Sequence, residues 1–246
     1  MKSTKDIVYE TAKRTLGRFG LKVAFDYPFR SPEKLITLKA AELGVGTVLD
    51  VGANRGQFAR GLREAGYAGA IVSFEPLSRV HAELVRTAAR DAHWVVMPAM
   101  ALGDAPGRAT INVSRNLASS SLLPVGRRSV DAGPESGFVG TEEIEIQRLD
   151  DVADPAWPGH FALKLDTQGF ELHVLRGARE TLKKTVLVAV ELSLVPLYDN
   201  GATFVDVFRL LGDSGFRCIN LFEGFADRAR NEVLQMDGVF VRDVKV

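Results

Sequence analysis

Short apolar runs alternate with longer amphipathic stretches over most of this chain. The runs are rich in Val, Ile, Leu and Phe and lie at residues 47–51, 70–74, 94–97, 161–165 and 186–190. The stretches that follow them have apolar residues at helical spacing, which predicts helices at residues 56–65, 78–89, 171–182 and 204–211. Strands that are apolar on both faces need cover on both faces, so the pattern predicts a mostly parallel sheet between two layers of helices. Residues 216–221 and 238–241 predict a closing pair of strands.

The first thirty residues follow a different pattern. Residues 4–19 predict an amphipathic helix whose apolar face is formed by Ile7, Val8, Ala12, Leu16 and Phe19. A proline-containing stretch at 27–32 then breaks the chain, and Pro32 is suited to open a helix that reaches about Leu43. We therefore predict an N-terminal helical extension over residues 1–31 and one domain over residues 32–246.

The charge of this extension leaves two interpretations of its role open. Residues 1–30 carry seven basic and three acidic side chains, a net charge of +4. The helix at 4–19 either packs on the domain or on a second subunit, or it makes peripheral contact with an anionic membrane surface or covers a substrate as a lid.

Composition excludes several other classes of protein. The 246 residues have a formal net charge of zero, so we expect no nucleic-acid partner. Cys218 is the only cysteine, which rules out an intrachain disulfide and a multi-cysteine metal site. No apolar run is long enough to cross a bilayer, and charges interrupt the first residues too often for a secretory signal. We therefore expect a cytoplasmic protein.

Acidic residues stand where four of the predicted strands end. They are Asp50, Glu75, Asp166 and Glu191. In open parallel sheets ligands bind beyond the carboxyl ends of the strands. Packing alone does not require acids at four such positions, so they are candidates for a binding site.

The loop after the first strand favours a particular cofactor. It reads Asp50-Val51-Gly52-Ala53-Asn54-Arg55-Gly56. Gly52 permits a tight turn and Gly56 lets the next helix begin close to the strand. The middle glycine of the dinucleotide motif G-x-G-x-x-G is absent. An acid beside the loop would repel a pyrophosphate but suits a cationic sulfonium, which favours S-adenosylmethionine over NAD. The alternative is a purely structural turn.

Glu75 adds to this interpretation. It lies 19 residues beyond Gly56, after the second strand. A carboxylate at this point can accept hydrogen bonds from both ribose hydroxyls of a cofactor, as in dinucleotide enzymes. The alternative is that Glu75 caps the following helix.

Together these residues resemble the FkbM family of methyltransferases. The resemblance covers about residues 47–240. It rests on the Asp50–Gly56 loop, on Phe74-Glu75-Pro76, on the run from Lys164 through Asp166, Gly169 and Glu171 to Gly177-Ala178, and on Glu191. One departure stands out, because Thr167-Gln168-Gly169 occupies a place where the family often has Val-Glu-Gly.

The resemblance implies a Rossmann-like class I methyltransferase fold of the α/β class. Its sheet has seven mostly parallel strands with helices on both faces. The implied methyl donor is S-adenosylmethionine, and the implied reaction is O-methylation of a small-molecule or glycan acceptor such as a sugar in a glycolipid, polysaccharide or natural product. The candidate cofactor residues are Asp50, Gly52, Ala53, Asn54, Gly56, Glu75, Pro76 and Leu102.

Lys164, Asp166 and Glu191 are the candidate catalytic residues. Lys164 and Asp166 point to the same face of a strand, and a buried lysine needs a charged partner. Lys164 therefore either forms a structural ion pair with Asp166 or Glu191, or helps Asp166 to orient an acceptor hydroxyl. Glu191 is placed to act as a general base. Alternatively, Asp166 and Glu191 hold a divalent cation through their oxygens.

A less regular region at residues 107–149 supplies further candidates. It is strand-like at 109–113 and at 142–148, with a polar, hydroxyl-rich loop between them. Such loops are often only turns, but this one can also bind acceptor hydroxyls. The candidate acceptor-binding residues are Asn116, Ser119, Ser120, Ser121 and Gln168.

Two rival functions belong to other classes. One is a non-catalytic protein that only binds S-adenosylmethionine or a partner, which the altered Thr167-Gln168 leaves open. The other is a NAD(P)-dependent oxidoreductase. It would need the G-x-G-x-x-G motif and a Tyr/Lys or His proton donor, and neither is evident in the sequence.

Overall fold

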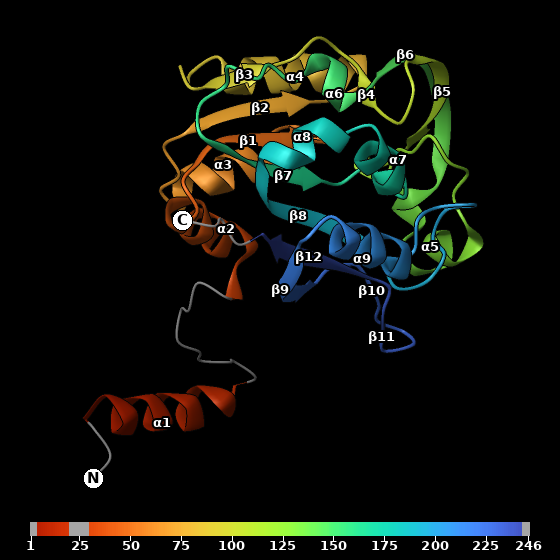
Figure 1. The fold of residues 1–246 in the computed structure, drawn as a ribbon. Helices are drawn as coiled ribbons and strands as arrows, with labels where there is room; N and C mark the ends of the chain where they lie inside the picture. Colours follow the sequence, from red (N-terminus) through yellow and green to blue (C-terminus); the bar gives the residue numbers. More distant parts are fainter. Residues whose placement is uncertain (1–3, 20–29, 243–246) are drawn as a thin grey trace.

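The computed structural model describes residues 4–19 and 30–242 of the chain. A seven-stranded sheet runs through the domain in the order β3-β2-β1-β7-β8-β12-β9 (Figure 1). Its strands are β1 (Val45–Val51), β2 (Ala70–Phe74), β3 (Trp94–Val96), β7 (His160–Leu165), β8 (Thr185–Ser193), β9 (Arg217–Glu223) and β12 (Gln235–Val241). The first five in the spatial order pair in parallel, while β12 is antiparallel to both β8 and β9. The predicted parallel sheet and its closing pair are confirmed.

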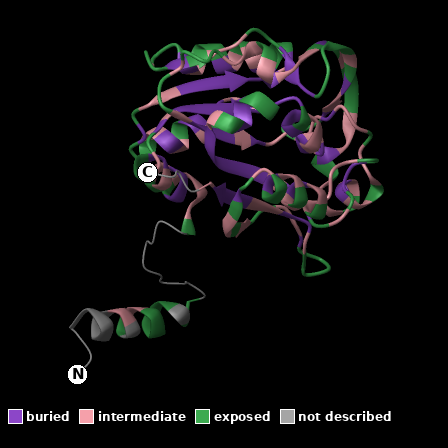
Figure 2. Ribbon diagram, viewed as in Figure 1, coloured by how far each residue is buried: buried purple, intermediate pink, exposed green. Residues whose placement is uncertain are grey.

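Helices cover both faces of this sheet. The helices of the domain are α2 (Pro32–Glu42), α3 (Gln57–Glu64), α4 (Ser78–Ala88), α5 (Arg127–Ala132), α6 (Leu149–Val152), α7 (Glu171–Arg176), α8 (Arg179–Lys184) and α9 (Phe204–Asp213), with a 3-10 turn, η2, at Pro134–Ser136. The sheet separates two hydrophobic clusters. One lies beneath α2, α3 and α4, and the other lies beneath α6 to α9. In β1, Val48 belongs to the first cluster and Leu49 and Val51 to the second. The strands are accordingly the most buried part of the molecule (Figure 2).

The helix predicted at 171–182 is in fact two helices. α7 ends at Arg176 and α8 begins at Arg179. Gly177 lies so close to a neighbouring loop that a β-carbon there would come within 1.9 Å of the Gly103 carbonyl oxygen. The Asp150 carboxylate then accepts hydrogen bonds from the backbone N–H groups of Glu180 and Thr181, at 3.1 and 2.8 Å. This contact caps α8 and starts it in a new direction.

The irregular region forms a separate small sheet. Its strands are β4 (Ala101–Leu102), β5 (Gly107–Ser114) and β6 (Phe138–Gln147), in the order β4-β6-β5. The prediction of strands at 109–113 and 142–148 is confirmed, but β6 begins at Phe138, four residues before the predicted strand. A two-stranded sheet of β10 (Ala226–Asp227) and β11 (Glu232–Val233) completes the fold.

The N-terminal helix α1 (Thr4–Gly17) confirms the helix predicted for residues 4–19. Leu16 and Phe19, from its predicted apolar face, are 37% and 77% exposed. The side chains of Ile7 and Val8, and residues 27–29 of the predicted break at 27–32, lie outside the described residues. The predicted helix from Pro32 is confirmed, with the Ser31 side chain accepting a hydrogen bond from the Lys34 N–H. No helix in the described part of the chain is both long and apolar enough to cross a membrane. Membrane contact by α1 stays a prediction.

Candidate active site

A cavity of about 680 Å³ opens at the carboxyl ends of β1, β2, β7 and β8. This volume lies in the range of small-molecule and cofactor sites. The loop between β5 and β6 forms one wall. Almost all the predicted site residues line the cavity: Gly52, Ala53, Asn54, Glu75, Pro76, Leu102, Asn116, Ser119, Ser120, Ser121, Lys164, Asp166, Gln168 and Glu191.

Asp50 and Gly56 are the two predicted site residues that do not line the cavity. The side chain of Asp50 is fully buried beneath Lys164, opposite it in the β1–β7 register. Its carboxylate accepts a hydrogen bond from the Ser73 hydroxyl at 3.2 Å, which in turn accepts one from the Trp94 indole at 2.9 Å. Asp50 thus does not line the cavity, and its role in cofactor binding stays a prediction. Gly56 is the N-cap of α3, and a β-carbon there would meet the Trp94 ring at 2.5 Å.

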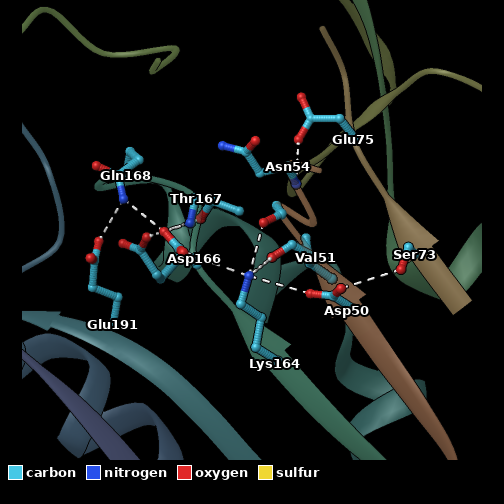
Figure 3. Close-up of polar contacts among 12 residues, drawn as sticks. Asp50, Val51, Asn54, Ser73, Glu75, Lys164, Asp166, Thr167, Gln168 and Glu191 are labelled. Atoms are coloured by element: carbon cyan, nitrogen blue, oxygen red, sulfur yellow. Dashed lines mark hydrogen bonds and ion pairs between the residues drawn. The ribbon is translucent and has the colours of Figure 1, made fainter. Parts of the chain in front are cut away.

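Lys164 connects the two sides of the site (Figure 3). Its Nζ lies 3.3 Å from Asp50 Oδ1 and 3.6 Å from Asp166 Oδ2, so the predicted Lys164–Asp166 ion pair is confirmed. The same Nζ donates hydrogen bonds to the carbonyl oxygens of Gly52 and Val51, at 2.8 and 3.4 Å. Burial alone would lower the pKa of Lys164, but Asp50 and Asp166 raise it above its ordinary value. Lys164 is therefore a fixed cation that ties the end of β1 to the end of β7.

The tight turn at Gly52 serves the backbone. Gly52 has a φ of +72°, and a β-carbon at this position would lie 1.9 Å from the carbonyl oxygen of Asp166. The glycine is thus required by the contact between two strand ends. The tight turn predicted at Gly52 is confirmed.

Glu75 holds the loop that follows β1. Its Oε2 accepts a hydrogen bond from the Asn54 N–H at 2.9 Å (Figure 3), and its Oε1 accepts one from the Leu77 N–H at 3.0 Å. The second bond lies just before α4, whose N-cap residue is Leu77 and which has no side-chain cap, so the predicted capping role of Glu75 stays a prediction. Burial raises the pKa of Glu75 to about 7. Within the described residues, the buried Oδ1 of Asn54 has no hydrogen-bond partner and can accept one from a ligand.

Two carboxylates and an amide form the other end of the cavity. The Gln168 Nε2 donates to Asp166 Oδ1 at 2.7 Å and to Glu191 Oε2 at 2.9 Å (Figure 3). Burial is the main cause that raises the pKa of Glu191 well above its ordinary value, and the nearby carboxylates of Asp166, Glu171 and Asp237 add to it. The alternative pair of Lys164 with Glu191 is not an ion-pair contact in the described structure.

Sequence reasoning missed four residues of this end. Tyr198 donates from its hydroxyl to Gln168 Oε1 at 2.6 Å, and Gln235 Nε2 donates to Glu191 Oε2 at 2.8 Å. Asp237 lines the cavity, and burial raises its pKa to about 6. The Glu171 carboxylate accepts hydrogen bonds from the backbone N–H groups of Thr167 and Gly169, at 2.9 and 3.2 Å, and so fixes the turn after β7. Only Glu171 could have been found, from its place in the motif after Gly169.

The hydroxyl-rich loop is held by its own side chains. The Asn116 Oδ1 accepts hydrogen bonds from the Ser114 hydroxyl at 2.8 Å and from the Ser119 N–H at 2.9 Å. The Ser120 hydroxyl donates to the Leu117 carbonyl at 2.8 Å, and the Ser121 hydroxyl donates to the Gln168 carbonyl at 2.7 Å. These hydrogen bonds fix the loop as an ordered wall of the cavity. Its contact with an acceptor stays a prediction.

The donor set at the carboxylates does not fit the predicted divalent cation. Among the described residues, no group of three or more His, Cys, Asp or Glu side chains is arranged to hold a metal ion. The lone pairs of Asp166 and Glu191 that face each other already accept from the Gln168 amide. A cation between them would need an oxygen where this nitrogen stands.

Comparison with known proteins identifies the family of the chain. The sequence profile of the methyltransferase FkbM domain matches residues 50–218. A sequence comparison with curated proteins gave no match. Similar solved structures include magnesium protoporphyrin IX methyltransferase (ChlM) from Synechocystis PCC 6803 with bound S-adenosylmethionine, at 10% identity, 99% coverage of each chain and a TM-score of 0.48.

Two further structures resemble the chain at a similar level. The O-methyltransferase TomG from Streptomyces achromogenes has 15% identity, with 99% of this chain and 92% of that chain covered and a TM-score of 0.46. The N-methyltransferase NodS from Bradyrhizobium japonicum WM9 has 9% identity, with 89% and 99% covered and a TM-score of 0.48. The match to the family profile extends from the end of β1 into β9 and includes Glu75, Lys164, Asp166 and Glu191. The chain therefore belongs to the FkbM family of S-adenosylmethionine-dependent methyltransferases, with a Rossmann-like class I fold.

Proposed function

We propose that this chain transfers a methyl group to a hydroxyl oxygen, and that the acceptor is a sugar of a glycolipid, polysaccharide or natural product. One observation carries the proposal. A single cavity joins the Gly52–Asn54 loop and Glu75 at one end to Asp166 and Glu191 at the other. The first end suits the donor and the second suits an acceptor with exchangeable protons.

The residues at the first end fit S-adenosylmethionine. When bound, it supplies an electrophilic methyl group on a sulfonium. The Glu75 carboxylate, which accepts only one backbone hydrogen bond on each oxygen, keeps lone pairs for the ribose hydroxyls. The unpartnered Asn54 Oδ1 would accept a hydrogen bond from the ammonium group. Asp50 acts indirectly in this proposal. It fixes Lys164 by an ion pair, and Lys164 in turn holds the Gly52 carbonyl oxygen of the loop.

Glu191 is the general base in this proposal. Its Oε2 accepts from two side-chain amides, those of Gln168 and Gln235. No described residue donates to its Oε1, which is left to take the proton of an acceptor hydroxyl. Burial raises the pKa of Glu191 well above its ordinary value, which makes this carboxylate a stronger base. Asp166, beside it, orients the hydroxyl. As the C–S bond breaks and the C–O bond forms, the hydroxyl proton passes to Glu191.

The charge of the cavity favours a neutral, polyhydroxylated acceptor. Lys164 is the only cation among the described residues that line it, and its ammonium is already engaged by Asp166 and Gly52. Six carboxylates line the same cavity, those of Glu33, Glu75, Glu135, Asp166, Glu191 and Asp237. An anionic acceptor such as a sugar acid would meet repulsion without a compensating cation.

Labelled methyl transfer tests the proposal. The full chain is incubated with S-adenosylmethionine carrying a labelled methyl group and with neutral glycosides, amino sugars and uronic acids in parallel. We expect a methyl ether on one or more neutral glycosides, identified by mass spectrometry and NMR, and no product from uronic acids. A methyl group found on nitrogen or carbon would refute O-direction.

Cofactor binding distinguishes the rival functions. We expect S-adenosylmethionine and S-adenosylhomocysteine to raise the melting temperature, while NAD and NADP leave it unchanged. A shift with NADP alone would favour an oxidoreductase. A shift with S-adenosylmethionine, without transfer to any of the three acceptor classes, would favour a protein that binds the cofactor without catalysis.

A further inference from the structure

The Gln168 amide occupies the point where two carboxylates of the acceptor end meet. Its Nε2 carries two hydrogens, and both are used, one toward Asp166 Oδ1 at 2.7 Å and one toward Glu191 Oε2 at 2.9 Å. A single nitrogen therefore bridges two groups that would otherwise repel each other. In many sites of this composition a divalent cation performs that task with oxygen ligands.

The amide is held in one orientation. The Tyr198 hydroxyl donates to Gln168 Oε1 at 2.6 Å, and a donor at that position would oppose an amide that turned its nitrogen there. The turn is fixed as well, because Gln168 has a φ of +53° and its carbonyl accepts from the Ser121 hydroxyl at 2.7 Å. Tyr198 also packs on Gly169, where a β-carbon would lie 3.1 Å from its ring. The nitrogen thus has to face the carboxylates.

Other hydrogen-bond donors near the site do not bridge Asp166 and Glu191. Lys164 contacts Asp166 Oδ2, on the side away from Glu191, and its ammonium also serves Asp50 and Gly52. The Gln235 amide reaches only Glu191, at 2.8 Å. Among the described residues, Gln168 alone donates to both carboxylates.

We propose that Gln168, oriented by Tyr198, is the positioning residue of the acceptor end and takes the place of a divalent cation between Asp166 and Glu191. The inference rests on the proposed function, in which this end of the cavity binds the acceptor. It explains how two carboxylates stay side by side in the cavity, and it makes the site selective against metal ions. A change of one atom, from the amide nitrogen to oxygen, should reverse that selectivity.

Manganese binding tests this directly and needs no acceptor. Gln168→Glu in the full chain brings three carboxylates together with little change in shape. Free Mn²⁺ is measured by electron paramagnetic resonance, and melting temperature is recorded with MnCl₂ and with EDTA. We expect Gln168→Glu to bind Mn²⁺ at least tenfold more tightly than the wild type, because three carboxylate oxygens are the ligands that hard divalent cations prefer. Only the variant should be stabilised by Mn²⁺.

Two further variants make the result decisive. Gln147→Glu makes the same chemical change on β6, away from the cavity lining, and should bind Mn²⁺ as weakly as the wild type. Tyr198→Phe keeps the ring but removes the hydroxyl that holds the amide. The amide can then turn its oxygen toward the carboxylates, and we expect Mn²⁺ affinity to rise at least threefold. If Gln168→Glu does not fold, as judged by circular dichroism, Tyr198→Phe decides.

Two results would overturn the inference. One is a wild type that binds Mn²⁺ within threefold of Gln168→Glu. The other is no gain of affinity in any folded variant of Gln168 or Tyr198. Binding of S-adenosylmethionine is measured on the same samples by calorimetry. Its absence in the wild type would count against the proposed function, whereas the manganese result would still judge the role of Gln168.

Discussion

Removing the charge of Lys164 should destabilise the fold strongly. Lys164→Met keeps most of the side-chain volume but leaves the Asp50 carboxylate, which has no exposed surface, without its cation. At 3.3 Å and an effective dielectric constant of about 20, the lost attraction is about 5 kcal/mol. The desolvation cost of Asp50 stays, so we expect the free energy of unfolding to fall by about 3–5 kcal/mol. For a chain of this length that lowers the melting temperature by roughly 10 °C.

Urea and thermal denaturation of three variants measure this loss. Asp50→Asn combined with Lys164→Met removes both charges, so the double variant should recover most of the stability lost in the single one. Lys183→Met is the matched control, because its partner Glu180 and Lys183 itself are 70% and 72% exposed. Such a surface pair contributes less than about 1 kcal/mol. A loss below about 1 kcal/mol in Lys164→Met, or a double variant less stable than the single one, would refute the reasoning.

Three further predictions concern the turn, the donor end and the acceptor end. Gly52→Ala should prevent folding, as seen by near-UV circular dichroism, because its β-carbon would lie 1.9 Å from the Asp166 carbonyl oxygen. Gly66 is also at positive φ but in open space, so Gly66→Ala should lower the free energy of unfolding by only about 1–2 kcal/mol. Glu75→Ala should weaken S-adenosylmethionine binding by about 1–3 kcal/mol in calorimetry. Burial raises the pKa of Glu75 to about 7, and a protonated carboxyl loses acceptor capacity. The affinity of the wild type for S-adenosylmethionine should therefore fall as the pH drops from 8 to 6. A flat pH profile would show that Glu75 holds only the backbone. Asp166→Asn and Glu191→Gln should keep cofactor affinity within about threefold and lose about 10²–10⁴-fold in turnover, so full turnover in both would remove these carboxylates from the mechanism.

The central sheet could be predicted because its strands are buried on both faces. β1, β7 and β8 need apolar residues at consecutive positions, which gives short, dense runs that are easy to recognise. The strand-end carboxylates followed from the same pattern, since parallel strands bring their carboxyl ends to one edge. The break between α7 and α8 could not be predicted, because its cause is the contact of Gly177 with a loop some seventy residues earlier in the chain.

The detailed contacts of the site depend on tertiary structure in the same way. Tyr198 and Gln235 come from the segment after β8 and from β12, and neither stands in a motif that points to the cavity. The place of Asp50 depends on tertiary structure too. Its place beside the glycine loop favoured direct contact with a ligand, whereas the β1–β7 register sets it under Lys164. Spacing along the chain predicts which strand end a residue occupies but gives no information on which layer of side chains it joins.

The small sheet of β4, β5 and β6 has a consequence for how the family diversifies. The cavity wall at residues 116–122 emerges from this sheet, and its apolar contacts form a cluster separate from the two that flank the central sheet. Replacement or lengthening of the loop therefore leaves the packing around β1, β7 and β8 intact. We therefore expect a loop graft that keeps the Ser121 contact with the Gln168 carbonyl to change the cavity wall without unfolding the domain. A graft between β5 and β6 is accordingly the natural place to begin redirecting the enzyme to another acceptor.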